Sequence, residues 1–462
     1  MMTLNLALRN LLRNRRRSLA TVLAMAIGST SILLFGGYSN NINYTMHTAY
    51  VQKGGHLQIQ HRDFYLYGSG NPTAYGIADY TSILAAIQSD EVLRNMVLVA
   101  TPILQFGGVA GNYAASVSRT IVGNGFIAED INRMRRWNDF GLGTLTPVFP
   151  LEGAPADAAI VGTGVARVLQ LCDALKIERC PKPEKEQKID GKAIPADIAQ
   201  LSLQEAPAPS GASPRKIDVL AGNARGTPNV TSLEIIRAED QGFKELDEIY
   251  LMMHLAKAQQ LIYGKSPPKV TSIILQLRHS DQIPAALVRL APILATFSAS
   301  QPLAVLDFRT LNPFYVQTIQ LFDTIFGFIF ALIGAIVLFT VSNTMNTAVV
   351  ERTVEIGTLR AIGLRRAGIR RLFVTEGALL GLCGAVLGAM LALLFSAVVN
   401  QTGLTWSPPG TVEALPLMLR VWGDTRMIFG TTFGLICIAV LSAWWPAYRA
   451  ANLDVVDALR HA

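Results

Sequence analysis

The chain has 462 residues, of which 50% are hydrophobic and only 16% are charged, and its formal net charge is +7. A mean hydropathy of +0.33 excludes an ordinary soluble globular protein. The positive charge does not require nucleic acid as a partner, because the arginines gather in short segments beside apolar runs, as membrane topology demands.

The first segment, residues 1–18, predicts a cytoplasmic amphipathic helix on the inner membrane surface. Leucines stand at 4, 8, 11 and 12, and five arginines precede the first apolar run. A cleaved secretory signal is the alternative. However, the apolar run exceeds the usual ~7–15 residues, and no small-residue cleavage site clearly ends it. We therefore interpret the segment as part of a retained anchor.

Four uncharged runs approach or exceed the ~20 residues that a helix needs to cross a membrane. With their flanks, they predict transmembrane helices over residues 19–39, 316–345 (including an outward extension), 374–399 and 427–446. The predicted fold class is a membrane protein with four transmembrane α-helices and a large α+β extracytoplasmic domain between the first and the second.

The distribution of arginine predicts the orientation. The connector between the second and third spans, residues 346–373, carries six arginines and two glutamates. Short loops rich in arginine stay on the cytoplasmic side. We therefore expect both termini, including the tail 447–462, and the connector to be cytoplasmic. Residues 40–315 and 400–426 would lie on the opposite, extracytoplasmic side of the membrane.

The external segment 40–315 contains both strand and helix patterns, which predict an α+β domain with two subdomains. Strands are expected at 55–60, 159–161, 232–237 and 271–277, and helices at 81–96, 165–171, 255–262 and 279–298. Residues 180–228, rich in proline, lysine, alanine and serine, predict an inserted loop.

The four cysteines fall into two groups. Cys383 and Cys437 lie in predicted spans, where a thiol most often only packs. Cys172 and Cys180 are eight residues apart in the external segment. In an oxidising compartment they are a candidate disulfide, and two unrelated thiols are the alternative.

No enzymatic motif stands out. Gly264-Lys265-Ser266 lacks the first glycine of a phosphate-binding loop, where Gln259 stands, so this chain does not bind ATP by that route. His56 and His61 are an odd number of residues apart in a predicted strand. They would therefore point to opposite faces and bind no shared metal. We interpret both as surface residues and expect neither a catalytic nor a metal site.

The third span carries glycines on one helical face, at four- and three-residue spacing. They are Gly377, Gly381, Gly384 and Gly388. Small residues let another helix approach closely, within or between protomers, although glycine is also simply frequent in membrane helices. Glu376, just before this face, would either sit among the headgroups or pair with a connector arginine. An ion-path role is less favoured.

A family resemblance rests on the connector. Residues 351–363 read E-R-T-V-E-I-G-T-L-R-A-I-G. This segment resembles the E-R-x-x-E-I-G-x-x-[RK]-A-[IL]-G signature of the FtsX/MacB/LolC-LolE-type permeases of the ABC superfamily. The ending from Pro446 to Arg460 is also similar, although Val455 stands where the family usually has proline. Residues 6–14, 160–171 and 247–261 look like further family segments. The stretch 180–228 does not.

The resemblance implies four spans, a periplasmic domain and a dimer of permease protomers, served by two cytoplasmic ABC ATPases that bind ATP and Mg²⁺. The connector would contain the coupling helix that docks on the ATPase. The residues implied in coupling are Glu351, Arg352, Glu355, Ile356, Gly357, Arg360, Ala361 and Gly363. Ile356, Leu359 and Ile362 would form its apolar stripe. Anchoring on the membrane surface is the alternative.

The predicted function is coupling of ATP hydrolysis in a separate subunit to periplasmic conformational change that extracts or exports lipoprotein, lipid or another amphipathic cargo. Candidate cargo contacts are His56, Phe64, Tyr65 and Tyr67. Expected partners include membrane lipid and a periplasmic carrier or adaptor. The alternative is a transducer of the cell-division type that activates a periplasmic hydrolase without transport, and a peptide receptor is a third, weaker idea.

Overall fold

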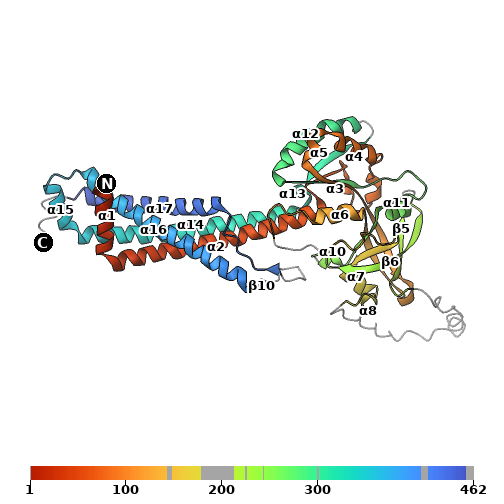
Figure 1. Cartoon of the computed structure of the whole chain (residues 1–462), viewed down its shortest axis with the longest axis horizontal. Coiled ribbons are helices and arrows are strands. Elements are labelled where there is room, and N and C mark those ends of the chain that lie inside the picture. Colours follow the sequence, from red (N-terminus) through yellow and green to blue (C-terminus); the bar gives the residue numbers. More distant parts are fainter. Residues whose placement is uncertain are drawn as a thin grey trace. The chain divides into compact units, whose positions relative to one another are not determined.

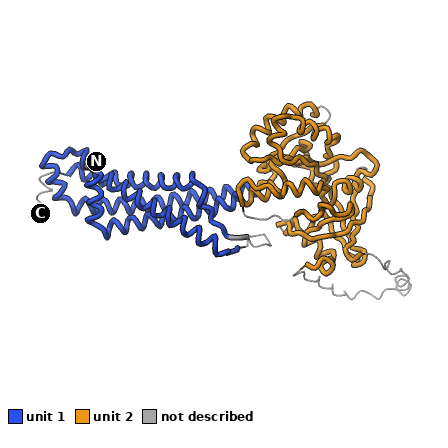
Figure 2. Tube along the Cα trace, viewed as in Figure 1, with its two compact units in different colours: residues 1–44, 314–406, 415–462 blue, residues 45–313, 407–414 orange. Residues whose placement is uncertain are grey.

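The computed structural model describes residues 2–142, 148–177, 213–223, 226–242, 244–298, 301–406 and 415–453. The chain forms two compact units, which Figure 2 distinguishes by colour. Unit 1 comprises Met1–Tyr44, Phe314–Trp406 and Leu415–Ala462, and unit 2 comprises Thr45–Pro313 and Ser407–Ala414.

Unit 1 is helical, and four of its helices are long and apolar enough to cross a membrane. These four are α2 (Arg15–Gly54), α14 (Pro313–Glu351), α16 (Arg366–Thr402) and α17 (Thr425–Ala451). The short helices are α1 (Met2–Arg13) and α15 (Thr353–Ala361), and the strands β10 (Thr405–Trp406) and β11 (Leu415–Pro416) form a small pair. The protein is therefore a membrane protein with four candidate spans (Figure 1).

Helix α2 is much longer than the predicted span at residues 19–39. It has 40 residues, and its last ten, from Thr45 onward, belong to unit 2. No proline interrupts residues 40–54, so the helix continues until Gly55. Gly55 adopts a φ of +68°, a left-handed conformation that side chains disfavour and that ends the helix.

The glycine face of α16 meets two neighbouring helices of the same chain. A Cβ added at Gly377 would lie 2.4 Å from the Cβ of Ala443 in α17, and one at Gly384 would lie 2.5 Å from the Cβ of Met25 in α2. Gly381 likewise faces α17, and Gly388 faces α2. These four glycines thus allow close helix packing within the protomer.

In its described residues, unit 2 has nine strands and a set of shorter helices. The strands are β1 (Leu57–His61), β2 (Val97–Asn112), β3 (Val117–Phe126), β4 (Ala158–Gly162), β5 (Lys216–Gly222), β6 (Pro228–Glu239), β7 (Tyr250–His254), β8 (Ser272–Leu277) and β9 (Leu303–Asp307). The helices are α3 (Phe64–Tyr67), η1 (Pro72–Tyr75), α4 (Tyr80–Ser89), α5 (Glu91–Met96), η2 (Tyr113–Ala115), α6 (Ala128–Arg135), α7 (Thr163–Val168), α8 (Cys172–Leu175), α10 (Lys244–Asp247), α11 (Leu255–Tyr263), η3 (Ser280–Gln282), α12 (Ile283–Phe297) and α13 (Phe308–Leu311).

Strand pairing divides unit 2 into a barrel and an open sheet that share β2. The order β2-β3-β7-β4-β6-β5 returns to β2, so these six strands form a closed ring. The first part of β2, from Val97 to Ile103, instead pairs with β8. Strand β8 also pairs with β1, and β1 pairs with the edge strand β9, so these strands form the open sheet. The expected two subdomains thus correspond to two lobes joined through one long strand.

Several predicted elements differ in detail. The helix expected at 81–96 is broken at Asp90, whose carboxylate accepts hydrogen bonds from the backbone N–H groups of Val92 and Leu93 and starts α5. The loop prediction for 180–228 is wrong at its end, where β5 pairs with β2 and β6. Residues 178–212 lie outside the described part of the chain.

Cys172 is disulfide-bonded, whereas Cys383 and Cys437 are free. Its predicted partner, Cys180, lies outside the described residues. The pairing of these two cysteines therefore stays a prediction.

Candidate functional site

The candidate site is the junction at α15, where the connector begins. Helix α14 ends at Glu351, and α15 starts at Thr353. Between them Arg352 leaves helical geometry, with φ −108° and ψ 17°. This bend therefore carries the three charged residues of the E-R-x-x-E motif, which are Glu351, Arg352 and Glu355.

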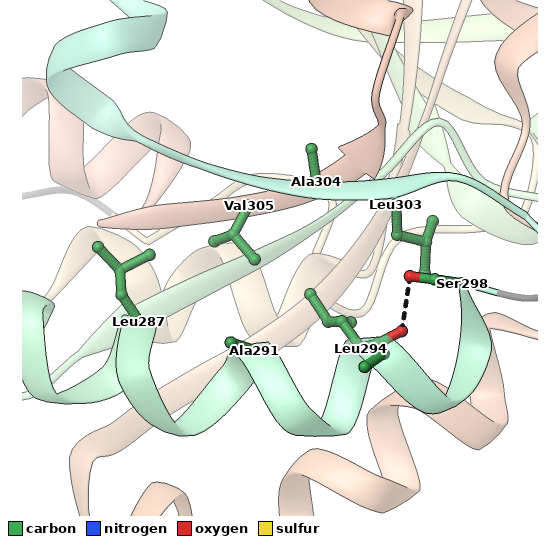
Figure 3. Close-up of a pocket in the computed structure, with 8 residues that line it drawn as sticks. Leu287, Ala291, Leu294, Ser298, Leu303, Ala304 and Val305 are labelled. Carbon is green, nitrogen blue, oxygen red and sulfur yellow. Dashed lines mark hydrogen bonds between the residues drawn. The ribbon is translucent and has the colours of Figure 1, made fainter.

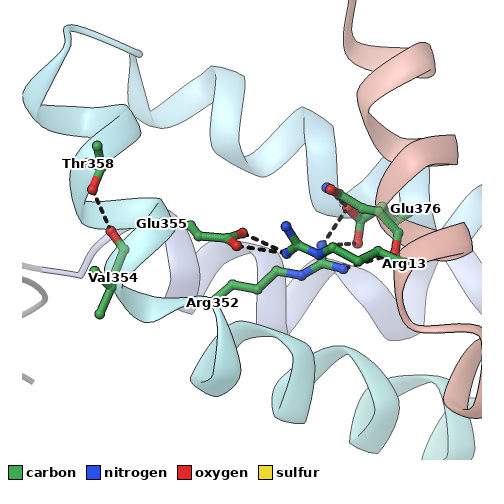
Figure 4. Close-up of polar contacts among 7 residues, drawn as sticks. Arg13, Arg352, Val354, Glu355, Thr358 and Glu376 are labelled. Atoms are coloured by element: carbon green, nitrogen blue, oxygen red, sulfur yellow. Dashed lines mark hydrogen bonds and ion pairs between the residues drawn. The ribbon is translucent and has the colours of Figure 1, made fainter. Parts of the chain in front are cut away.

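Two of these residues pair with arginines of the N-terminal segment. Arg17 donates two hydrogen bonds of 2.6 Å to the carboxylate of Glu351, and Arg13 pairs with Glu355 at 2.8 Å. The Glu355 hydrogen bond is the main reason why the pKa of Arg13 is raised above its usual value. The connector is thus tied to α1 through the Arg13–Glu355 pair (Figure 4) and to the start of α2 through Arg17.

The third residue, Arg352, forms a buried ion pair with Glu376 of α16. Their side chains are only 7% and 1% exposed, and the closest N–O distance is 3.1 Å. The side-chain amide of Asn10 in α1 donates a hydrogen bond of 2.6 Å to the Glu376 carboxylate. The backbone carbonyl of Asn10 accepts a hydrogen bond of 3.2 Å from Arg352. Of the alternatives weighed for Glu376, pairing with a connector arginine is the one found.

The side of α15 that is free to contact a partner is not the side that the sequence predicted. Ile356 is 3% exposed and packs in the core of the helix bundle, and Gly357 is also buried. The expectation that these two residues contact a partner is therefore wrong for this conformation, because the bundle already covers them. The exposed face carries Val354, Thr358 and Ile362, the last with 80% exposure.

The end of α15 is held by specific contacts. Gly363 has a φ of +103°, which favours glycine, and the N–H of Leu364 donates to the carbonyl of Leu359 across the end of the helix. Arg360 donates to the backbone carbonyl of Leu453 just after α17. Ala361 and Gly363 are exposed, whereas Arg360 is half-buried.

Sequence reasoning missed the N-terminal partners of the connector. The arginines of this segment were used only to predict the orientation in the membrane. In the structure, Arg13 and Arg17 bond carboxylates of the connector, and Asn10 bonds the carboxylate of Glu376 in α16. The available signal was charge complementarity, since the N-terminal segment has no acidic residue and the motif supplies two glutamates.

In unit 2 the surface interpretation of His56 is wrong. Its side chain has no exposed area and lies against Trp137, with ring centroids 4.9 Å apart. The N–H of Leu277 donates to its Nδ1, so the proton resides on Nε2, which lies 3.1 Å from the hydroxyl of Ser280. Burial lowers the pKa of His56 to about 3. A side chain this buried does not touch a cargo in this conformation.

The other proposed contacts lie on the short helix α3. Tyr65 and Tyr67 are exposed, and so is Leu66 between them, which sequence reasoning did not include. The hydroxyl of Tyr65 donates to the carbonyl of Thr310 at 3.0 Å. Phe64 is half-buried beside Tyr75. Helix α3 therefore presents an apolar and aromatic patch, made of Tyr65, Leu66 and Tyr67.

Unit 2 also holds an apolar cavity of about 350 Å³ between α12 and the edge strand β9 (Figure 3). Leu287, Leu294 and Val305 help to line it, and no charged side chain does. Within the described ranges, no cluster of three or more histidine, cysteine or acidic side chains is arranged to hold a metal ion.

Comparisons with known proteins give a family model for part of the helical unit and several relatives. The family model of the FtsX-like permease C-terminal domain matches residues 324–455. The lipoprotein-releasing system transmembrane protein LolC of Haemophilus influenzae is 29% identical over 157 residues, 34% of this chain and 38% of LolC. LolC of Neisseria meningitidis serogroup B is 25% identical over 244 residues, 51% of this chain and 56% of that protein.

The macrolide export ATP-binding/permease protein MacB of Shewanella sp. (strain W3-18-1) is 35% identical over 167 residues, 33% of this chain and 22% of MacB. The matches thus span between 22% and 56% of the relatives' own lengths. Residues 324–455 therefore form an FtsX-like permease domain, and the chain is similar to ABC transporter permeases of the FtsX, MacB and LolC type.

Proposed function

We propose that the chain is the permease subunit of an ABC transporter whose ATP hydrolysis takes place in a separate cytoplasmic ATPase dimer. Two permease protomers, of the same or a homologous chain, would share that dimer, which would bind ATP and Mg²⁺. Helix α15 would dock on the ATPase, with both termini in the cytoplasm and unit 2 outside the inner membrane. The cargo would be a lipoprotein, a lipid or another amphipathic molecule.

One observation carries the docking proposal: the E-R-x-x-E motif fastens α15 to the helix bundle along one face and leaves the other face uncovered. Arg13 and Arg17 bond Glu355 and Glu351, and Ile356 is buried. Together with the buried Arg352–Glu376 pair, these contacts would let a displacement of α15 pass to α1, α2 and α16. Its exposed face supplies the apolar side chains that a helix-binding groove takes up.

Docking is tested by placing a charge on the exposed face. The full chain with Ile362→Glu should no longer co-purify with the ATPase. Permease-stimulated ATP hydrolysis should fall at least about tenfold. The reason is that burying a carboxylate in an apolar groove costs several kcal/mol. Val288→Glu, at an equally exposed apolar residue of α12, is the control. Retention of the ATPase by the Ile362 variant would refute docking through this face.

The cargo proposal rests on the patch Tyr65, Leu66 and Tyr67 of α3 and on the similarity to LolC, which is named as a lipoprotein-releasing protein. A photoreactive residue at Tyr67 should cross-link a lipidated or amphipathic cargo in cells that supply ATP. A probe at Tyr113 in η2, which is at least as exposed as Tyr67, should not. Capture of a hydrolase activator instead would favour the signalling alternative.

A further inference from the structure

A cavity of about 430 Å³ in unit 1 lies between α1, α15 and the first turns of α16. Apolar side chains form much of its wall, among them Leu359 and Phe373. Arg9, Arg13 and Arg352 line it as well, against a single acidic residue, Glu355. The cavity is therefore amphipathic, with an excess of positive charge.

The buried guanidinium of Arg352 has spare hydrogen-bonding capacity at this cavity. Its two terminal nitrogens bond Glu376 and the carbonyl of Asn10. Its Nε–H, although buried, has no hydrogen-bond partner among the described residues. A buried donor without an acceptor costs free energy, so a small shift of this side chain toward a ligand oxygen in the cavity is favoured.

The position of the cavity indicates where that oxygen comes from. Its walls stand where the candidate spans begin or end: α14 ends at Glu351 and α16 starts at Arg366. Helix α1, which forms one wall, exposes leucines along its length, at Leu4, Leu6, Leu8 and Leu12. Exposed leucines beside arginines are the pattern of a helix in the membrane interface.

We propose that this cavity binds the headgroup of an anionic glycerophospholipid. The lipid phosphate would accept hydrogen bonds from Arg9 and from the Nε–H of Arg352, because a guanidinium matches phosphate oxygens in charge and geometry. Its glycerol and upper acyl carbons would lie against Leu6 and Leu359. The bound lipid would join α1 to α15 in addition to the Arg13–Glu355 pair. The site does not depend on the ATPase.

The test uses the full chain, reconstituted in phosphatidylcholine vesicles that contain a small share of photoactivatable phosphatidylglycerol. After irradiation, mass spectrometry should find labelled peptides from α1 and α15. Arg9→Ala should lower this labelling about fivefold, the effect expected of one arginine near an anionic surface. Leu359→Trp keeps every charge but fills the cavity, and it should lower labelling at least as much.

Arg16→Ala is the matched control, because Arg16 is exposed at the same end of the helices and does not line the cavity. Its labelling should equal that of the wild type. An equal loss in this variant, undiminished labelling in Leu359→Trp, or equal labelling by a phosphatidylcholine probe would overturn the proposal. Displacement of the lipid by inorganic phosphate would also overturn the proposal. The same holds if a photoreactive residue at Leu6 cross-links to a protein instead of to lipid.

Discussion

Three ion pairs surround the start of α15, and their burial decides what each contributes. Arg13 and Glu355 are both 52% exposed, so their pair contributes at most about 1 kcal/mol. Arg352 and Glu376 are buried, and the net contribution of such a pair to stability is small because both charges lose their hydration. Removal of one partner, however, leaves the other charge buried and unpaired.

Arg352→Ala should therefore destabilise the helix bundle by about 3–5 kcal/mol, because Glu376 would keep only Asn10 as a partner. The measurement is the melting temperature of the detergent-solubilised chain, followed by size-exclusion chromatography after heating. The double variant Arg352→Met with Glu376→Leu should melt higher than Arg352→Ala. Glu355→Gln, at the exposed pair, should change stability by less than about 1 kcal/mol. Equal melting of Arg352→Ala and Glu355→Gln would contradict this account.

His56 gives unit 2 an expected dependence on pH. Desolvation by burial is the main cause that lowers its pKa from 6.5 to about 3; His47 lowers it further, and Asp139 opposes both by raising it. Above pH 6.5 the imidazole is neutral in both the folded and the unfolded state. As the pH falls toward 3, the unfolded chain binds a proton that the folded unit does not, so folding becomes less favourable.

Between pH 6.5 and about 4 the wild type should thus lose on the order of 3 kcal/mol from this group. His56→Asn should be less stable at neutral pH but should show a flatter dependence of melting temperature on pH. Tryptophan fluorescence is a suitable signal, because Trp137 packs on His56. His61→Asn, at the other end of β1, controls for the loss of an imidazole. An equally steep curve in His56→Asn would rule out this histidine as the cause.

At the scale of elements, the sequence predicted best the helices and strands that arise from uninterrupted patterns. The uncharged runs correspond to α2, α14, α16 and α17, and the strand and helix patterns correspond to β8 (Ser272–Leu277) and α11 (Leu255–Tyr263). Strand β2 was missed because Pro102 and three glycines lower its strand propensity. Gly108 is needed there, since a Cβ would lie 2.7 Å from the carbonyl oxygen of Leu220 in β5.

The sequence predicted where the candidate site lies along the chain, but not which side chains of the site are exposed. The motif located α15 correctly within the chain, yet its periodicity left open which side faces the bundle. Ile356 belongs to an apolar stripe that suits a partner groove and the bundle core equally well. Only the packing against α16 and α17 decides between them, and that depends on residues far away in the sequence.

Close packing of α16 on α2 predicts a specific sensitivity at Gly388. A Cβ there would lie 2.4 Å from the Cβ of Ser29 and 2.6 Å from the backbone oxygen of Ala26, so a helix backbone must shift. Gly388→Ala should cost about 1–3 kcal/mol, measured as a lower melting temperature in detergent. Gly327→Ala in α14, where a Cβ meets open space, should be neutral or stabilising by up to about 1 kcal/mol. Equal melting of the two variants would show that the helices do not pack this closely.

At the scale of the whole molecule, the order of the spans along the chain constrains which residues share a compartment. Ile362 follows α14, and Val288 lies between α2 and α14. One candidate span, α14, therefore separates the two positions. If α14 crosses the membrane, they lie on opposite sides whatever the arrangement of the two units. The arginines at 365, 366, 370 and 371 favour the cytoplasm for Ile362.

Cysteines introduced separately at Ile362 and Val288 should thus react in different compartments. Both parent side chains are about equally exposed, at 80% and 77%, so protein burial does not explain a difference between them. In cells with a permeabilised outer membrane and an intact inner membrane, an impermeant maleimide should modify Val288→Cys at once. It should modify Ile362→Cys only after lysis. The unsubstituted chain measures the background from Cys383 and Cys437. Reaction of both positions before lysis would mean that α14 does not span the membrane, and a coupling helix separated by the bilayer from unit 2 would then be impossible.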